Sequence, residues 1–221
     1  MKEFIVELFY PFLSLLHHAT HEWIIAIVLF TLLFKVLLSP FTYRMLQKQQ
    51  HNNKIRKNLM PLLDELKKKY EKSPLEYIAK QKEVEQKHGI NNHHTLRLFL
   101  LNGVVMLILY FVFSTNGIHM SSHFIPWVSH FQMPDPFHVF PVIVTLTSFL
   151  SNLLSNGTEV VEVAFKQKVT FSLMISLGSL FFLWKSPIAL AIYWITSNVY
   201  TMIEKLCFKM LFHHKNKKDF L

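Results

Sequence analysis

The sequence predicts an all-α integral membrane protein with five transmembrane helices, a cytoplasmic helical hairpin and an N-terminal interfacial helix. Three observations favour this fold. The apolar residues, 51% of the 221 residues, fall into five long runs, each near the roughly 20 residues that cross a bilayer core. The charged residues fall mainly between these runs. All but three of the 23 Lys and Arg residues lie on one side of the topology that the runs define, the exceptions being Lys2, Lys35 and Lys185.

The five runs form a core predicted over residues 22–208. They cover residues 23–41, 96–113, 137–154, 169–184 and 188–208. Only three residues separate the last two runs, which requires a tight helical turn at one membrane face. Because Lys and Arg are enriched in cytoplasmic loops, the charge asymmetry predicts an outer N-terminus and a cytoplasmic C-terminus. Residues 209–221 are then a basic cytoplasmic tail.

Residues 1–21 are predicted to form an amphipathic helix that lies in the membrane interface. The apolar stretch at residues 8–16 is interrupted by Pro11, and Glu3 and Glu7 stand where a cleavable signal would be basic. These features disfavour a cleaved signal peptide. A short uncleaved anchor is the alternative interpretation.

Residues 43–89 are polar and basic and are predicted to form the cytoplasmic hairpin. Apolar side chains at helical spacing share one face, namely Leu59, Leu63, Leu66 and Tyr70. Ser73 and Pro74 are typical of a helix start, with Glu76 completing a capping box. Gly89 is typical of a helix end. A disordered charged linker is the alternative, which the paired start and stop signals disfavour.

The chain shows no convincing catalytic motif. We expect no catalytic residue, no metal site and no cofactor. His17 and His21 lie one helical turn apart and could share a metal, but an interfacial polar role is favoured. Cys207 is the single cysteine, which excludes an intrachain disulfide. Its residue type favours a small buried apolar side chain.

Lys35 is the residue that most needs an explanation, because a charge inside a membrane span is costly and is a functional hint. It lies twelve residues after Trp23, roughly 18 Å along a helix and therefore below the bilayer midplane. No acidic residue is available within a span to neutralise it, because Glu159, Glu162 and Glu204 all lie at the cytoplasmic ends of the spans. We therefore expect a lone cation that faces a wet cavity. The alternative is a side chain that snorkels to the inner headgroups.

Two more polar residues in the runs accompany Lys35. Thr31 lies one turn above it on the same helix face, and Asn102 interrupts the second run. Such residues are often hydrogen-bonding contacts between membrane helices. Together with Lys35 they could instead line a hydrated groove.

Several segments, in order along the chain, resemble the YidC/Oxa/Alb membrane protein insertase family, as a short bacterial-type member. The first run around Thr31 to Phe41 is similar to the family's first core span, with Lys35 where the family usually has arginine. The hairpin is similar at Met60-Pro61, Lys69-Tyr70 and Lys87 to Asn91. Pro134-Asp135-Pro136-Phe137 resembles the entry to the third span, and Pro187 to Asn198 is the most similar segment. Asn102 occupies a position where the family usually has glutamine.

The resemblance implies a hydrophilic groove that is open to the cytoplasm and to lipid but closed on the outside. The residues that would line it and bind clients are Lys35, Thr31, Asn102, Tyr193, Trp194 and Asn198. A client's short polar flank would cross through this groove while its apolar segment moves into lipid. The chain would then be an insertase and not an enzyme, with no cofactor and no small-molecule substrate.

The resemblance also implies a bacterial plasma (inner) membrane protein. Its partners would be nascent membrane protein clients, with the ribosome, the Sec translocon and anionic lipids as further candidates. Two other functions stay open from the residues. One is a membrane-embedded folding or assembly chaperone without insertion activity. The other, less favoured, is a small transporter.

Overall fold

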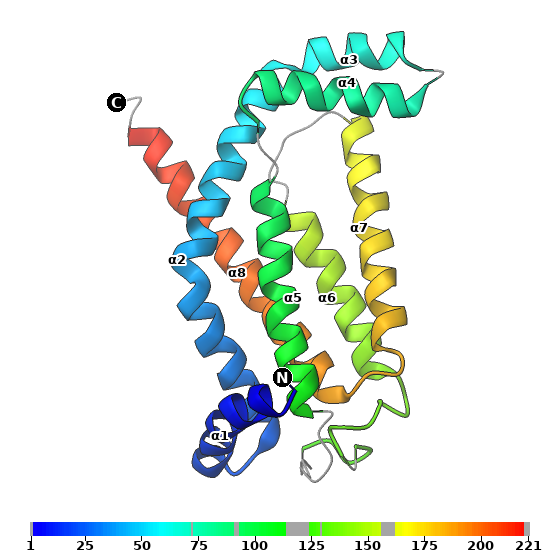
Figure 1. Cartoon of the computed structure of the whole chain (residues 1–221). Coiled ribbons are helices and arrows are strands. Elements are labelled where there is room, and N and C mark those ends of the chain that lie inside the picture. Colours follow the sequence, from blue (N-terminus) through cyan, green and yellow to red (C-terminus); the bar gives the residue numbers. More distant parts are fainter. Residues whose placement is uncertain are drawn as a thin grey trace. The chain divides into compact units, whose positions relative to one another are not determined.

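The computed structural model describes residues 2–71, 73–90, 93–113, 124–128, 130–155 and 162–218. Every regular element in these ranges is an α-helix (Figure 1). The helices are α1 (Lys2–Thr20), α2 (Trp23–Asn58), α3 (Met60–Lys69), α4 (Pro74–Lys87), α5 (His93–Phe113), α6 (Val139–Ser155), α7 (Glu162–Leu183) and α8 (Ile188–Lys218). The predicted all-α class is confirmed for this part of the chain.

The chain divides into two compact units. The first joins Met1–Ser39 to Asn102–Leu221, and the second is Pro40–Leu101. The chain passes from the first unit to the second within α2 and returns within α5. Each unit has its own packed residues and is described separately.

Within the described ranges, α2 is the one helix that is both long and apolar enough to cross a membrane. Its most apolar stretch has a mean hydropathy of 2.5, yet only 28% of that stretch is buried inside the protein. A large exposed apolar surface of this kind suits contact with lipid better than the core of a soluble protein. Shorter apolar helices cover Asn102–Phe113, Val139–Leu154 and Val169–Leu183. The five-span bundle stays a prediction.

The sequence-based boundary between the first span and the hairpin lies within one continuous helix. The first run was expected to end near residue 41, but α2 continues through Pro40 as far as Asn58. A proline inside a helix removes one backbone hydrogen bond and crowds one carbonyl. Helices in membranes tolerate this when other groups compensate for the lost bond. The second unit begins at Pro40, so it includes the last turns of α2, and the predicted hairpin bounds of 43–89 stay a prediction.

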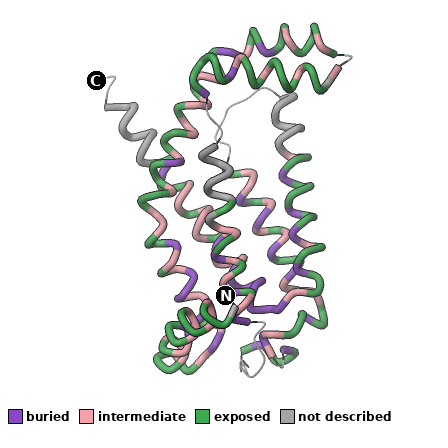
Figure 2. Tube along the Cα trace, viewed as in Figure 1, coloured by how far each residue is buried: buried purple, intermediate pink, exposed green. Residues whose placement is uncertain are grey.

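The apolar core of the first unit is concentrated at one end of its helices (Figure 2). It is built from the first turns of α2, α6 and α8 and from the last turns of α5 and α7. Representative buried residues are Ile27, Leu109, Phe113, Val144, Leu183 and Leu190. Leu13 of α1 and Phe131 of the connection before α6 belong to the same cluster. The helices are thus closed by packed apolar side chains at this end.

The connection before α6 fixes this end through backbone groups. The first amides of α8 donate to it, Ile188 N to Met133 O at 3.0 Å and Ala189 N to Phe131 O at 3.1 Å. These amides have no partner within their own helix. Asp135 is 2% exposed, and its carboxylate accepts a 2.8 Å bond from the backbone N–H of Phe140 in the first turn of α6. A carboxylate at this position is favoured by the helix dipole.

Helix α6 packs against both α7 and α8. Both α6 and α7 place small polar residues in the buried part of the bundle, namely Ser148, Ser151, Ser172, Ser176 and Ser179. Small side chains let membrane helices approach closely. The hydroxyl of Ser176 donates to the carbonyl oxygen of Ser172 at 2.7 Å, so its polar group is satisfied within its own helix.

Helix α1 has three different faces. One face packs on the apolar core and carries Val6, Phe9, Tyr10, Leu13 and Leu16. A second face is apolar but exposed, with Phe4, Leu8, Phe12 and Leu15. Glu3 and Glu7 are exposed on the remaining side. Faces suited to protein, lipid and water are what an interfacial helix requires, although the interfacial position itself stays a prediction.

The second unit contains α3 and α4, which lie side by side (Figure 1). Its small apolar core consists of Leu59, Leu63 and Ile90, with Leu66 packed against them. Three of the four apolar residues expected on one face therefore pack together. The fourth, Tyr70, instead has the ammonium group of Lys69 5.8 Å from its ring centre.

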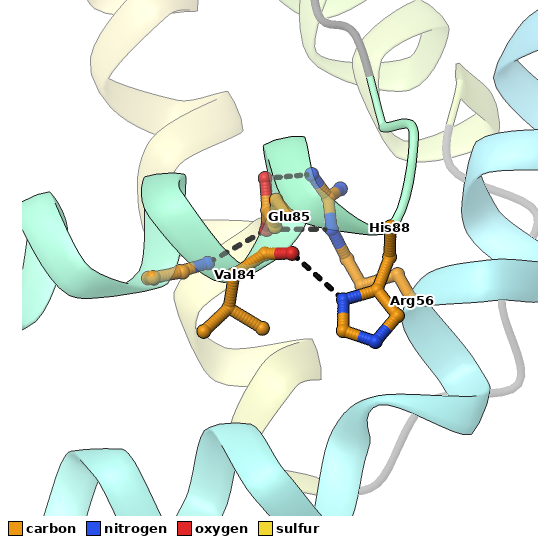
Figure 3. Close-up of polar contacts among 5 residues, drawn as sticks. Arg56, Val84, Glu85 and His88 are labelled. Atoms are coloured by element: carbon orange, nitrogen blue, oxygen red, sulfur yellow. Dashed lines mark hydrogen bonds and ion pairs between the residues drawn. The ribbon is translucent and has the colours of Figure 1, made fainter.

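An ion pair joins α2 to α4 inside this unit (Figure 3). Arg56 donates from Nε and Nη2 to the two carboxylate oxygens of Glu85, both at 3.0 Å. Gln81 adds a third bond to Glu85 Oε1 at 3.0 Å. The side chain of Glu85 is only 7% exposed, whereas that of Arg56 is 40% exposed. Paired hydrogen bonds of this geometry are among the stronger ones in proteins.

Helix α4 starts where the sequence predicts it, but the predicted capping hydrogen bonds do not form. Pro74 occupies the first turn, but Ser73 makes no side-chain capping bond. The backbone N–H of Ser73 donates to Tyr70 O at 3.0 Å, so it is not available to Glu76 as a capping box requires. At the other end, Gly89 has a φ of 78° directly after His88. This is the left-handed backbone that glycine favours at a helix end.

The surface of α4 carries a second group of charges. Lys80 and then Lys87 donate hydrogen bonds to Glu83, which lowers the pKa of its carboxyl to about 2. The interaction is therefore present at neutral pH and is lost only as the pH falls through about 2. Because all three side chains are exposed, solvent screens the attraction and the contribution to stability is small.

Candidate functional site

Lys35 lies on α2, between one and two turns beyond Phe30 of the apolar core of the first unit. Its side chain turns into the bundle and the residue is 8% exposed. The ammonium Nζ donates to Asn102 Oδ1 of α5 at 2.9 Å and to Thr201 Oγ1 of α8 at 3.4 Å. One cation therefore links three helices that are far apart in the sequence.

This arrangement corrects the expectation of a lone cation that faces a wet cavity. An amide oxygen and a hydroxyl oxygen are suitable partners for an ammonium with three donors. Glu204, one turn beyond Thr201 on α8, also attracts Lys35 electrostatically. This attraction was not expected, because Glu204 lies near the end of the last apolar run.

Thr201 is a site residue that the sequence reasoning missed. Its hydroxyl donates to Ser197 O at 2.7 Å, which leaves its oxygen to accept from Lys35. The segment of α8 that is most similar to known insertases ends at Asn198, before Thr201. The signal that could have found Thr201 is its spacing, because residues four apart share a helix face and Ser197 is buried.

Thr31 shares the helix face of Lys35 but does not contact it. The residue is 1% exposed, and its hydroxyl donates to Ile27 O at 2.7 Å. The structure therefore gives Thr31 a buried, internally satisfied position, and its expected role as groove lining stays a prediction. A threonine hydroxyl can satisfy itself in this way within its own helix.

Asn102 and Tyr193 are brought together by the structure. Tyr193 is 5% exposed and donates from its hydroxyl to the backbone oxygen of Asn102 at 3.5 Å. Asn102 thus accepts from Lys35 with its side chain and from Tyr193 with its main chain. Trp194 is half-buried and packs on the ring of Phe182 of α7, with centroids 6.1 Å apart.

Asn198 belongs to a separate polar group. Its amide nitrogen donates to Thr147 Oγ1 at 3.2 Å and to Ser148 Oγ at 2.9 Å, both on α6. Farther along α8, Lys205 Nζ donates to Ser151 O at 3.0 Å. These bonds join α6 to α8, and Asn198 takes no part in the hydrogen bonds of Lys35.

His17 and Cys207 are the remaining residues whose side chains could bind a metal or react. The ring of His17 stacks on Trp23 with centroids 4.0 Å apart, and burial is the main cause that lowers its pKa. Within the described ranges, no three His, Cys, Asp or Glu residues are placed to hold a metal ion. Cys207 was expected to be buried but is exposed, because it lies on a face of α8 away from the buried Phe208.

Comparison with known proteins agrees with the sequence resemblance. The family model described as 60Kd inner membrane protein matches residues 15–216. A membrane protein insertase YidC from Caldanaerobacter subterraneus subsp. tengcongensis is 26% identical over 196 residues, covering 89% of this chain and 89% of that protein.

Two further relatives are longer proteins. The membrane protein insertase YidC of Blochmanniella floridana is 28% identical over 97% of this chain but only 37% of its own length. That of Campylobacter jejuni is 26% identical over 96% of this chain and 39% of its own length. The chain thus spans less than two-fifths of these two relatives. The resemblance to the YidC/Oxa/Alb family is confirmed, and the chain belongs to the 60Kd inner membrane protein family.

Proposed function

We propose that this chain is a membrane protein insertase. It moves short hydrophilic flanks of client proteins through a hydrophilic groove and releases their apolar segments into the bilayer. The observation that carries the proposal is a hydrogen-bonded cation, Lys35, inside an apolar helix and directly below a packed apolar core. The relatives that match most of the chain are themselves named insertases.

The position of the core fits a groove that is closed at one membrane face. The buried apolar residues gather where α2 and α8 begin, whereas Lys35, Asn102 and Thr201 follow one to two turns beyond. In our proposal the packed end faces outward and the polar end opens toward the cytoplasm. A client flank would then have to cross only part of the membrane thickness without polar partners.

The energetics suit a chain that acts without catalysis. Each strongly apolar residue of a client favours insertion by about 0.3–0.6 kcal/mol at the helix centre, so a whole span supplies several kcal/mol. The insertase only has to lower the barrier for the polar flank. We therefore propose neither an enzymatic step nor a cofactor.

We propose five spans in a bacterial inner membrane, with the N-terminus outside and the C-terminus in the cytoplasm. Exposed apolar side chains on α6 and α7 support lipid contact, including Leu146, Leu150, Phe171 and Phe181. The second unit would lie in the cytoplasm, where its cationic side chains could meet anionic lipid or the ribosome. Nascent membrane proteins are the clients, and the Sec translocon is a further candidate partner.

Depleting the protein and following a labelled single-span client tests the function. An insertase predicts that the client's outer flank stays accessible to protease on the cytoplasmic side after depletion. Expression of the intact chain should restore protection. A client that inserts normally but fails to assemble would contradict the proposal and support an assembly chaperone.

The topology can be tested by cysteine labelling in a Cys207→Ser background, because the native cysteine is exposed. Met133→Cys, 57% exposed before α6, is expected to react with an impermeant reagent from outside. Leu75→Cys, 83% exposed on α4, should react only after permeabilisation. The reason is the positive-inside distribution of Lys and Arg. The opposite pattern of labelling would exclude this orientation.

A further inference from the structure

The Lys35 ammonium lies inside the helix bundle and does not extend toward the lipid headgroups. A lysine below the membrane midplane can extend its flexible stem toward the headgroups and keep its charge in water. In the structure the residue is instead 8% exposed, and its Nζ contacts α5 and α8. Specific acceptors must therefore hold the charge inside the bundle.

Thr201 is the more distant of the two acceptors, but the partner of its own hydroxyl hydrogen is known. A threonine hydroxyl has one hydrogen to donate and two lone pairs to accept with. Its hydrogen is directed to Ser197 O at 2.7 Å. The oxygen is therefore oriented to accept from Lys35, at 3.4 Å. The ammonium thus donates to the Thr201 hydroxyl, and that hydroxyl donates to the backbone of α8.

A nearby acidic residue on α8 also favours the position of the ammonium beside this helix. Glu204 follows three residues after Thr201 and attracts Lys35 electrostatically. On the opposite side, Asn102 of α5 accepts from the same ammonium at 2.9 Å. The cation is thus held between two helices and not along the axis of its own.

We propose that Thr201 is a positioning residue that, together with Asn102, holds the Lys35 ammonium inside the bundle to meet an acidic group in a client's outer flank. This inference rests on the proposed insertase function. Without the Thr201 acceptor, the side chain relaxes toward the headgroups. The insertase would then keep its charge but lose its preference for acidic flanks.

The experiment compares initial insertion rates of two matched single-span clients, one with a neutral and one with an acidic outer flank, at equal insertase levels. The readout is the ratio of the acidic to the neutral rate. Thr201→Val keeps the side-chain shape and removes the acceptor. We expect it to lower this ratio about threefold or more, because threefold lies at the lower end of the net contribution of one typical hydrogen bond and the bond to Lys35 is long.

Two variants serve as references. Thr201→Ser keeps the hydroxyl and is expected to restore the ratio toward that of the parent. Thr196→Val is the matched control, because Thr196 makes the same kind of bond within α8, to Ile192 O at 2.8 Å, but does not accept from Lys35. Its ratio should equal the parent's.

A structural role for Thr201 would lower both rates equally and leave the ratio unchanged, which would overturn the inference. If Thr201→Val does not accumulate, Thr201→Ala removes the same acceptor without added bulk and has the same expected ratio. A parent chain that inserts neither client would refute the proposed function itself. A parent that inserts both, with an unchanged ratio in Thr201→Val and Thr201→Ala, would refute only the role of Thr201.

Discussion

Lys35→Ala is expected to slow insertion of clients with acidic outer flanks about tenfold, while clients with neutral flanks are affected much less. Lys35→Glu should be the most harmful variant for the acidic clients, and Lys35→Arg should retain activity. The physical reason is that a cation inside a region of low dielectric attracts a carboxylate far more strongly than it would in water. A difference of about 1.4 kcal/mol in this attraction is sufficient for the tenfold effect.

Arginine can replace lysine here because the two acceptors of the ammonium are neutral oxygens. Asn102 Oδ1 and Thr201 Oγ1 can each accept from a guanidinium as well as from an ammonium. Glutamate reverses the charge and would place a carboxylate next to an amide oxygen and near Glu204. Repulsion of the acidic client then adds to repulsion within the site.

The measurement is the insertion rate of matched neutral and acidic clients at equal insertase levels. Lys48→Ala is the control, because it removes one positive charge from an exposed position of the same helix. It should leave the charge preference unchanged. If Lys35→Ala, Lys35→Glu and Lys35→Arg all insert both clients as well as the parent, Lys35 has no role in the groove and only seats its helix.

Features set by neighbouring residues could be predicted from the sequence. Pro74 and Gly89 mark the ends of α4 because each restricts or permits a particular backbone angle at its own position. The structure has both ends at these residues, with φ of 78° at Gly89. The apolar runs likewise indicated helices, because backbone groups in lipid require internal hydrogen bonds.

The partners of Lys35 could not be predicted in the same way. Asn102 is 67 residues away from it in the chain and Thr201 is 166 residues away. Their meeting depends on how α2, α5 and α8 pack, and helical periodicity describes only one helix at a time. Asn102 was found from its polarity within an apolar run, but Thr201 has a residue type that is common in membrane helices.

Polarity alone does not distinguish the surroundings of such residues. Thr31 and Asn198 are polar residues in apolar helices, as Asn102 is, yet their contacts differ. Thr31 bonds to its own helix, and Asn198 bonds to Thr147 and Ser148 of α6. A polar residue in a span can serve helix packing or a functional site, and only its partners distinguish the two roles.

Arg56→Met is expected to open the second unit and expose α4 to protease. The substitution keeps an apolar stem of similar length but leaves the carboxylate of Glu85, 7% exposed, with only the hydrogen bond from Gln81 of those described above. Loss of hydrogen bonds to a charged group costs about 2 kcal/mol, which corresponds to roughly a thirtyfold rise in the opened population. Cleavage that requires opening should accelerate in proportion.

A glutamate-specific protease added from the cytoplasmic side of membrane vesicles measures this opening. In the parent we expect the first cut at Glu71, which lies in the connection between α3 and α4. Cuts at Glu83, inside α4, should be slow in the parent and much faster in Arg56→Met. The membrane-spanning fragments should stay intact in both.

The double substitution Arg56→Met with Glu85→Met separates a buried charge from a lost contact. A buried ion pair is harmful mainly when one partner is removed, and replacing both partners by apolar residues is often neutral. We therefore expect the double variant to be cut at Glu83 more slowly than Arg56→Met. Lys54→Met is the matched control, because it removes one exposed charge from the same helix. If Arg56→Met and Lys54→Met are cut at Glu83 at the parent's rate, the pair does not hold α4 in place, and the apolar contacts of Leu59, Leu63 and Ile90 are sufficient.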